Sequence, residues 1–579
     1  MFSLSTLDLI IIVIFLITLF IISLRYVQKA KQSTQEFFLG GRNLPWWLAG
    51  TSMVATTFAA DTPLLITELV GNHGISGNWL WWNALIGGII TTFFFAKLWR
   101  RANVLTDVAF TEIRYGGKPA AFLRGFKSLY LGLFMNSVII AWVNLALMKL
   151  MFVFFGITYA QQLICVALAM LFVAIFSSIS GLLGVVVTDF IQFIFAMTGC
   201  IVLAFVVINS EKIGGITALV NKLPETTLSF FPRLNTGNEA SETIKGFSIG
   251  IATFFAFVGV QWWASWYPGA EPGGGGYVAQ RMMSAKNESH AIKATLFFQL
   301  AHYGLRPWAW IVVALCAIVL YPDLSETEKG LGYVMVMKDF LPEGLRGFLL
   351  AAFLAAYMST ISTQLNWGAS YLVHDFYQRF IKKQSSEKEL VNISRISTFL
   401  IMLIALGVTT MMDTLENAFK FMIECGAGLG AVLMLRWYWW RINVWSEITA
   451  TFAPFVGFAL SKFVLNLQFP NSLFFTAGIT TITWIIATYL TKPESDDTLI
   501  NFYKKVQPQG LWQPIAKKAK IEVSEENFKT LIMKCLLGII MVYSFLFATG
   551  YLILGNYPYG FICMGIFVFS IGYLWRKLE

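Results

Sequence analysis

The sequence predicts an all-α polytopic membrane protein, and three observations lead to that class. Of its 579 residues, 57% are hydrophobic and only 13% are charged, whereas soluble domains carry about 25% charged residues. The apolar residues gather in runs long enough to cross a bilayer, which takes about 20 residues. The lysines and arginines, which bring the net charge to +10, lie mainly between those runs. We therefore expect the chain to be embedded in a lipid bilayer.

About fifteen apolar runs are long enough to span a membrane. They lie near residues 7–25, 47–70, 79–99, 122–150, 160–182, 185–209, 244–266, 290–320, 345–376, 391–412, 416–438, 445–466, 471–491, 531–553 and 557–575. The first has no basic leader before it and no small-residue cleavage site after it, so we expect a retained helix and not a signal peptide. The six cysteines lie singly in apolar segments and predict neither a disulfide nor a zinc site.

The basic residues predict the orientation of the chain. If the N-terminus lies outside, most of the 42 lysines and arginines fall in cytoplasmic loops, in agreement with the positive-inside rule. Orientation then explains the net positive charge, and no nucleic-acid partner is expected. The C-terminus is predicted to be cytoplasmic. Both N-x-S/T sequons, at Asn287 and Asn392, also lie inside, so we expect a bacterial inner membrane.

Two of the spans are interrupted. The second contains Asp61, Thr62 and Pro63 at its middle, and the seventh ends in SWYPGAEPGGGG, residues 265–276. Proline and a glycine run cannot face lipid, because the freed backbone groups need partners, but they can line a cavity. The breaks begin two blocks of five spans, 47–209 and 244–440, which enter the membrane in opposite orientations because five is odd. Broken helices in two inverted halves are typical of the central site of a transporter.

The chain accordingly divides into three parts. We expect an extra transmembrane helix at 1–35, an inverted-repeat core at 36–440, and about four extra helices at 441–579 with a cytoplasmic loop at 492–530. That loop is too short for a kinase or another catalytic domain. The histidines lack metal-ligand spacing and no catalytic set is evident, so an enzyme is not expected. The sequence carries no signal for the oligomeric state or for the role of the C-terminal helices.

The ninth span is unusually rich in polar residues. Ser359, Thr363, Asn366 and Ser370 follow one another at intervals of 4, 3 and 4 and so share one face of a helix. Small polar residues let membrane helices pack closely. Alternatively, hydroxyls together with carbonyls of a broken helix ligate a cation such as sodium. Asp189, near the start of an otherwise apolar span, is either the compensating carboxylate or a residue at the membrane interface.

Several motifs, in the same order along the chain, resemble the sodium:solute symporter family. That family includes bacterial proline, sialic-acid and galactose symporters and the animal sodium–glucose cotransporters. The resemblance extends over residues 36–440 and is carried by GRNLPWW (41–47), SMVATTFAAD (52–61), TDFIQ (188–192), AQRMMSAKN (279–287), and AAYMSTIST (355–363) followed by HDFY.

The resemblance implies a five-plus-five inverted-repeat fold that binds Na⁺ between the first and eighth core helices. Matched by motif, the ligands of a first sodium are the main-chain carbonyls of Ala55, Phe58 and Ala356 and the hydroxyls of Ser359 and Thr360. Some members bind a second sodium, for which the matching positions here are Ser359, Ser362, Thr363 and Asp189. Two ions are chemically possible, and their number cannot be read from the sequence.

The solute pocket is where the chain departs from the family. Its expected walls are Asp61, Thr62 and Glu68 on the first core helix, Gln261, Trp262 and Trp263 at the second break, His302 and Arg306 on the next helix, and Glu424 on the tenth. His302 falls near a basic position that faces the sugar in sugar-transporting members. The alternative for His302 is a hydrogen-bonded core residue, and for the two tryptophans it is packing. The long break before AQR is unlike the short link of well-known members.

Aromatic residues together with Asp, Glu and Gln favour a sugar or sugar-like solute, whereas Arg306 favours an amino acid, a sugar acid or another carboxylate. We therefore expect a sodium-coupled symporter that imports a small polar solute by alternating access, with a sugar as the first candidate. A membrane sensor that does not transport, built on the same fold, is the alternative from another class. An ion channel is less consistent with broken helices and an asymmetric hydroxyl site.

Overall fold

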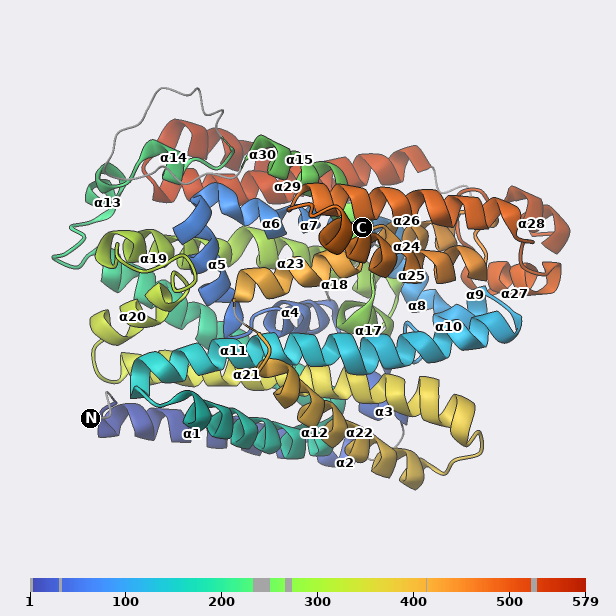
Figure 1. Cartoon of the computed structure of the whole chain (residues 1–579), viewed down its shortest axis with the longest axis horizontal. Helices are drawn as coiled ribbons and strands as arrows, with labels where there is room; N and C mark the ends of the chain where they lie inside the picture. The colour runs from blue at the N-terminus through green and yellow to red at the C-terminus, as the bar shows by residue number, and fades with distance from the viewer. Residues whose placement is uncertain are drawn as a thin grey trace.

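The computed structural model of the chain describes residues 4–30, 34–232, 250–265, 273–412, 414–521 and 528–578. Over these ranges the secondary structure is helical, with two isolated β-bridges and no strand. Most helices run along one direction (Figure 1), so that α13 and α20 lie at one end of the molecule and α27 and α28 at the other. The arrangement is that of a bundle that crosses a membrane.

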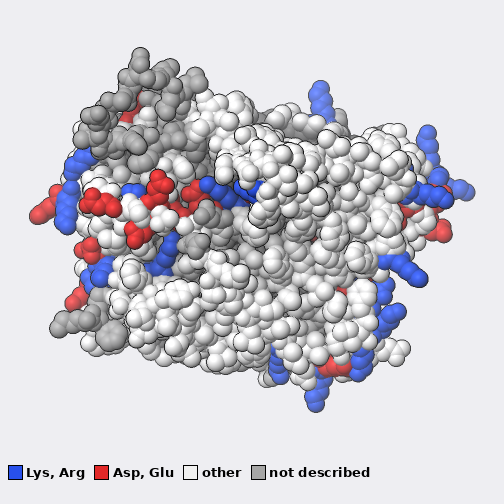
Figure 2. Space-filling model, in the orientation of Figure 1, with Lys and Arg blue, Asp and Glu red and all other residues white. Residues whose placement is uncertain are grey.

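In the part of the chain that the structure describes, 11 helices are long and apolar enough to span a membrane, or up to 13 if each bent pair is one span. Two shorter apolar helices, Tyr159–Ile175 and Ile251–Ala264, lie where two further spans are predicted. Figure 2 shows the charged side chains of one face mainly at the two ends, with a largely uncharged belt between them. The predicted all-α polytopic fold is confirmed.

The first block of the core contains both halves of the first broken helix. From the N-terminus to the end of this block, the helices are α1 (Thr6–Leu24), α2 (Val27–Ala30), α3 (Thr34–Leu39), α4 (Trp46–Thr56), α5 (Asp61–His73), α6 (Trp79–Trp82), α7 (Ala84–Ile90), α8 (Ala96–Ala102), α9 (Phe110–Arg114), α10 (Gly117–Leu129), α11 (Asn136–Phe155) and α12 (Tyr159–Ile208). The α12 stretch covers both predicted spans 160–182 and 185–209. A buried carboxylate, Asp8, fastens α1 to the core by accepting bonds from the N–H groups of Gly344 (2.8 Å) and Gly347 (2.7 Å).

The first predicted break is present, slightly earlier than expected. Helices α4 and α5 meet at 57° across residues 57–60. Pro63 itself lies in the first turn of α5, where a helix has no partner for its N–H groups, so the proline does not interrupt it. The interruption therefore precedes Asp61 and frees the carbonyls at the end of α4.

The second block begins with the other predicted break. Its helices are α15 (Ile251–Ala256), α16 (Trp262–Ala264), α17 (Gly276–Ser284), α18 (Glu288–Gln299), α19 (Pro307–Leu320), α20 (Leu331–Phe340), α21 (Leu345–Ser370), α22 (Glu387–Thr409), α23 (Leu415–Cys425) and α24 (Leu429–Tyr438), after two short helices, α13 (Ile216–Lys222) and α14 (Glu225–Leu228). The helix stops at Ala264 and resumes at Gly276. Residues 266–272 of the predicted break lie outside the described residues. Gly273 and Gly274 have φ of 82° and 81°, a backbone conformation that favours glycine.

A third bend was not predicted. The expected span 416–438 divides into α23 and α24, which meet at 48°. Gly428, at φ 97°, donates its N–H to the carbonyl of Ala264 over 2.6 Å. A side chain at Gly428 would lie 2.5 Å from Thr480, so only glycine allows this approach. The bend of the tenth core helix is thereby bonded to the second break.

The C-terminal part packs on the core. Its helices are α25 (Val444–Ala459), α26 (Asn471–Leu490), α27 (Asp496–Val506), α28 (Gln513–Ala519), α29 (Phe528–Ile553) and α30 (Tyr557–Leu578). Segment 492–530, predicted only as a loop, contains the two short helices α27 and α28. The Trp512 indole donates to the carbonyl of Trp437 over 2.8 Å, and the Glu494 carboxylate accepts from the N–H of Gly116 over 2.9 Å. This segment therefore covers the end of α24.

Candidate functional site

The break between α4 and α5 exposes main-chain carbonyls inside the bundle. The Ala55 carbonyl accepts the N–H of Phe58 over 2.9 Å, and the Thr56 carbonyl accepts the hydroxyl of Thr360 over 3.2 Å. Among the hydrogen bonds of the described residues, none is made to the carbonyl of Phe58. Carbonyls with free lone pairs at a broken helix are typical ligands of a coupling cation. The donor chemistry therefore fits a sodium ion beside Ala55 and Phe58.

Helix α21 brings its hydroxyl pair to this break. Ser359 and Thr360 are both buried, and Thr360 bonds directly to the carbonyl of Thr56, the last residue of α4. Ala356, whose carbonyl is the fifth expected ligand, is buried one turn earlier on the same helix. The sequence-predicted residues of the first sodium site thus come from the two helices expected, α4 and α21.

Asp189 is buried inside the helix bundle. Its carboxylate has no solvent exposure, and it accepts hydrogen bonds from Ser52 on α4 over 2.7 Å and from Ser359 on α21. The structure therefore brings Asp189 beside the hydroxyl pair of α21. The Ser362 hydroxyl donates to the carbonyl of Ser359 over 3.0 Å, and Thr363 lies one turn after Ser359.

A buried arginine lies among the residues of the possible second sodium site, and the sequence analysis did not assign it there. Arg281 on α17 donates to the hydroxyls of Ser52 and Thr363, both over 3.3 Å, and to the Gln280 side chain over 2.7 Å. Its guanidinium thereby bonds one of the oxygens expected for a second ion, the Thr363 hydroxyl. The signal in the sequence was the AQR motif, whose arginine follows the second break by a few residues.

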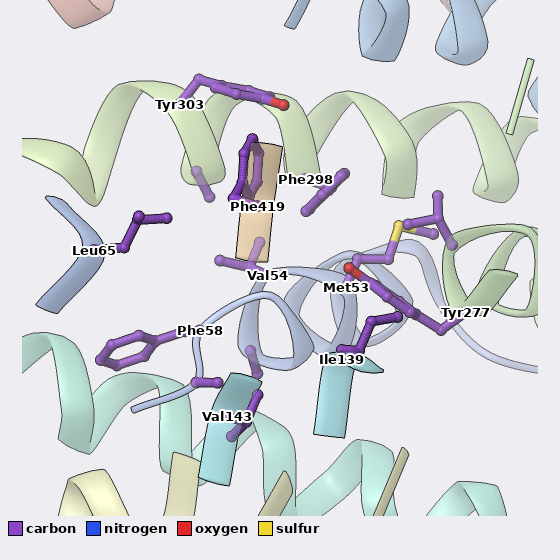
Figure 3. Packing of buried hydrophobic residues seen from close by; sticks show 14 of the residues in the cluster. Met53, Val54, Phe58, Leu65, Ile139, Val143, Tyr277, Phe298, Tyr303 and Phe419 are labelled. Atoms are coloured by element: carbon purple, nitrogen blue, oxygen red, sulfur yellow. The ribbon is translucent and has the colours of Figure 1, made fainter. Parts of the chain in front are cut away.

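A cavity lies beside the break, with about 780 Å³ of empty space, part of it open to solvent. Aromatic and apolar side chains line it together with a few polar groups, which is typical of a small-molecule site. Five of the nine predicted solute residues line it, namely Asp61, Thr62, Gln261, Trp262 and His302. Sequence reasoning missed other wall residues, among them Thr57, Trp81, Asn83, Trp142, Ser265, Phe298, Tyr303 and Phe419. Figure 3 shows Phe298, Tyr303 and Phe419 on one side of the loop that carries Phe58.

The cavity wall combines aromatic rings with unpaired acceptors. The Trp81 and Tyr303 rings stack at 5.6 Å with an angle of 23°. Buried oxygens of Asp61, Asn83 and Gln261 have no hydrogen-bond partner among the described residues. Burying such atoms without a partner is unfavourable. A ligand that donates several hydrogen bonds, such as a polyhydroxylated solute, would satisfy them.

Two of the other predicted solute residues bond elsewhere in the bundle. The Glu68 carboxylate lies 3.6 Å from the Lys149 ammonium and accepts the N–H of Glu416 over 3.2 Å. Glu424 accepts the hydroxyl of Ser472 over 2.6 Å. Neither residue lines the cavity. Glu68 therefore connects α5 with α11 and α23, and Glu424 connects α23 with α26.

The last two also lie off the cavity. Trp263 donates its indole N–H to the carbonyl of Gly259 over 2.8 Å, within its own helix. Arg306 is fully buried, and its guanidinium donates to the carbonyl of Val54 over 2.6 Å. Arg306 does not itself line the cavity but contacts the broken helix at Val54 and at the wall residue Thr57. Spacing along the chain does not indicate this direction.

The chain is similar to several known proteins. The model of the sodium:solute symporter family matches residues 37–449. The sodium/glucose cotransporter of Vibrio parahaemolyticus is 26% identical over 493 residues, which are 81% of this chain and 87% of that protein. The rabbit (Oryctolagus cuniculus) sodium/glucose cotransporter 1 is 23% identical, over 75% of this chain and 69% of its own. A solved Na⁺-coupled sialic acid symporter, bound to substrate and open outward, superposes with a TM-score of 0.65 at 18% identity, over 85% of this chain and 99% of its own.

Proposed function

Because the chain belongs to the sodium:solute symporter family, we propose that it uses sodium to import a sugar or sugar-like solute by alternating access. Membership makes it a sodium-coupled symporter, a multi-pass membrane protein whose partners are a small solute and the lipid bilayer. The fold is the inverted-repeat transporter core with broken first and sixth core helices, as in the sialic acid symporter.

One observation supports a sugar over the alternatives. The cavity wall has unpaired acceptor oxygens on Asp61, Asn83 and Gln261, and it also contains stacked aromatic rings. Hydroxyl groups donate to such acceptors, while sugar rings pack on aromatic faces. The sodium/glucose cotransporters among the relatives favour the same solute class. An amino acid, sugar acid or other carboxylate is the alternative, but the guanidinium of Arg306, which could have received that group, contacts Val54 instead.

The sodium site that we propose has five oxygens. They are the carbonyls of Ala55, Phe58 and Ala356 and the hydroxyls of Ser359 and Thr360. A second ion at Ser359, Ser362, Thr363 and Asp189 would share the Thr363 hydroxyl with Arg281, so the number of coupled ions has to be measured. One sodium driven by about 100 mV and a roughly tenfold gradient supplies about 3.7 kcal/mol, a several-hundred-fold accumulation, which a second ion would square.

We propose that the N-terminus lies outside and the C-terminus in the cytoplasm of a bacterial inner membrane. The end of the molecule that carries α27 and α28 is the one where Lys and Arg prevail in Figure 2, which supports a cytoplasmic location for that end. The cysteine-accessibility of residues in α13 and α28 in intact cells tests this orientation.

Thermal stability of the purified protein, in sodium and in potassium, tests the solute class. The panel consists of monosaccharides, sugar acids, amino acids and simple carboxylates. A ligand at about 100 times its dissociation constant stabilises the folded state by about 2.7 kcal/mol. We expect a monosaccharide to stabilise the protein in sodium only, and Gln261→Ala to weaken this effect, whereas Trp263→Phe, off the cavity, should not. Stabilisation by carboxylates alone would contradict the sugar assignment.

A further inference from the structure

Arg306 makes an unusual set of contacts for an arginine inside a membrane bundle. Its guanidinium donates to the carbonyl of Val54 over 2.6 Å, to the hydroxyl of Thr57 over 3.0 Å and to the carbonyl of Thr57 over 3.3 Å. The same group lies 5.1 Å from the ring centroid of Trp310 and 5.9 Å from that of Phe58. Val54 lies in the last turn of α4, and Thr57 and Phe58 lie on the segment that joins α4 to α5.

These bonds replace helix bonds that the break removes. In a continuing helix the Val54 carbonyl would accept the N–H of Phe58, but that N–H donates to Ala55 instead. Carbonyls freed in this way need other donors inside a membrane. The planar fork of a guanidinium can bond several acceptors at once, whereas a lysine ammonium cannot match that geometry. Arg306 satisfies Val54 and Thr57 and leaves the Phe58 carbonyl without a donor among the described residues.

The Thr57 hydroxyl connects this arrangement to the solute cavity. Its Oγ1 lies 3.0 Å from Nδ1 of His302, which lines the cavity, and 3.0 Å from the guanidinium of Arg306. Thr57 itself lines the cavity as well. A chain of direct contacts therefore runs from the cavity wall to the carbonyls at the end of α4.

We propose that Arg306 is the positioning residue of the sodium site: by binding Val54 and Thr57 it holds the broken segment so that the carbonyls of Ala55 and Phe58 face the ion. This inference rests on the sodium site of the proposed function. It assigns Arg306 to ion binding and not to recognition of a solute carboxylate. Through the Thr57 hydroxyl, the same contacts link occupancy of the solute cavity to the geometry of the sodium ligands.

The test is the sodium concentration that half-saturates thermal stabilisation of the purified full-length protein, with total salt kept constant by potassium. Wild type is compared with Arg306→Gln and Arg306→Lys, and with Thr57→Val in case the charge-removing variant does not fold. Thr360→Ala reports on the proposed site itself. Arg346→Gln is the matched control, since Arg346 also donates to a backbone carbonyl, that of Leu341 over 2.9 Å, away from the break.

We expect Arg306→Gln to raise the half-saturating sodium concentration by about tenfold or more, because charge-assisted bonds to two carbonyls are lost. Arg306→Lys should recover part of the affinity, and Thr57→Val should weaken it by a smaller factor. Arg346→Gln should leave the half-saturating sodium concentration unchanged and should at most shift the melting temperature measured in potassium. If the Arg306 variants keep the wild-type sodium dependence while Thr360→Ala loses it, the positioning role is wrong and the sodium site stands. If Thr360→Ala also keeps the wild-type sodium dependence, the positioning role and the sodium site are both wrong.

Discussion

The hydroxyl of Ser52 donates a hydrogen bond to the buried carboxylate of Asp189, with 2.7 Å between Oγ and Oδ2. Ser359 donates to the other carboxylate oxygen. Asp189 lies on α12, and its two partners lie on α4 and α21. One carboxylate therefore joins the two helices that carry the proposed sodium ligands, and Arg281 donates to the hydroxyl of the same Ser52 over 3.3 Å.

Asp189→Asn should lower sodium-driven uptake by about tenfold or more, since a neutral amide no longer balances the buried Arg281 or attracts a second cation. Uptake into proteoliposomes, measured against sodium concentration, gives both the rate and the Hill coefficient. A Hill coefficient that falls from two to one would indicate a second ion at Asp189. Asp496→Asn, in an exposed ion pair with Lys518 at 2.7 Å, is the control. Unchanged uptake in Asp189→Asn would contradict a role for this carboxylate.

The contact between Glu68 and Lys149 predicts that removing one of the two charges lowers the free energy of unfolding. Both groups are buried, and the carboxylate also accepts the Glu416 N–H. Lys149→Met should lower the free energy of unfolding by about 3–5 kcal/mol, because it leaves a buried charge uncompensated. The double variant Glu68→Gln with Lys149→Met should recover much of that loss. A double-mutant cycle, built from denaturant unfolding of the single and double variants, measures the interaction free energy between Glu68 and Lys149. Additive losses in the two single variants would show that the groups do not interact.

The ion pairs of Glu112 predict a dependence of stability on pH. Burial alone would raise the pKa of Glu112, but hydrogen bonds from Arg379 (2.8 Å) and Arg124 (2.6 Å) hold it below the ordinary 4.5. A carboxyl with a lowered pKa contributes stability that is complete above the unfolded-state pKa and disappears as the pH falls through the folded-state pKa.

Glu112→Gln should therefore be less stable than wild type at pH 7, and the difference in melting temperature should shrink as the pH falls below the ordinary pKa of the carboxyl. Glu288→Gln is the control, because it removes an ion pair with Arg101 in which the carboxylate side chain is 42% exposed. Surface pairs of that kind contribute about 0–1 kcal/mol. A pH-independent difference between Glu112→Gln and wild type would rule out the ion pairs as its cause.

Part of the proposed sodium site could be predicted from local pattern, and its carbonyl ligands came from the family resemblance. Ser359 and Thr360 stand out as hydroxyls in an apolar span, and Asp61, Thr62 and Pro63 indicated a break, which lies just before Asp61. The solute cavity was only half predictable. Arg306 precedes α19, which is apolar all round and so gives no periodic signal for the direction of that side chain. The direction of Glu424 depends on how α23 packs on α26, where it bonds Ser472.

The bend at Gly428 and the helices α27 and α28 were missed for related reasons. A single glycine in an apolar run is compatible with a continuous helix, and its need here comes from contact with Thr480, far along the chain. The segment around α27 is polar enough to read as a loop, but Trp512 and Glu494 fasten it to α24 and α10. Tertiary contacts decided both cases.

Equilibrium binding of radioactive sodium to the purified protein tests the central claim, which is that the broken segment and the hydroxyls of α21 hold the coupling ion. Thr360→Ala removes one proposed ligand, while Thr398→Ala removes a buried hydroxyl of α22 that, among the described residues, bonds its own helix at the Ser394 carbonyl over 2.9 Å. We predict that Thr360→Ala weakens sodium binding about tenfold or more and that Thr398→Ala leaves it unchanged. Wild-type sodium affinity in Thr360→Ala would contradict the account.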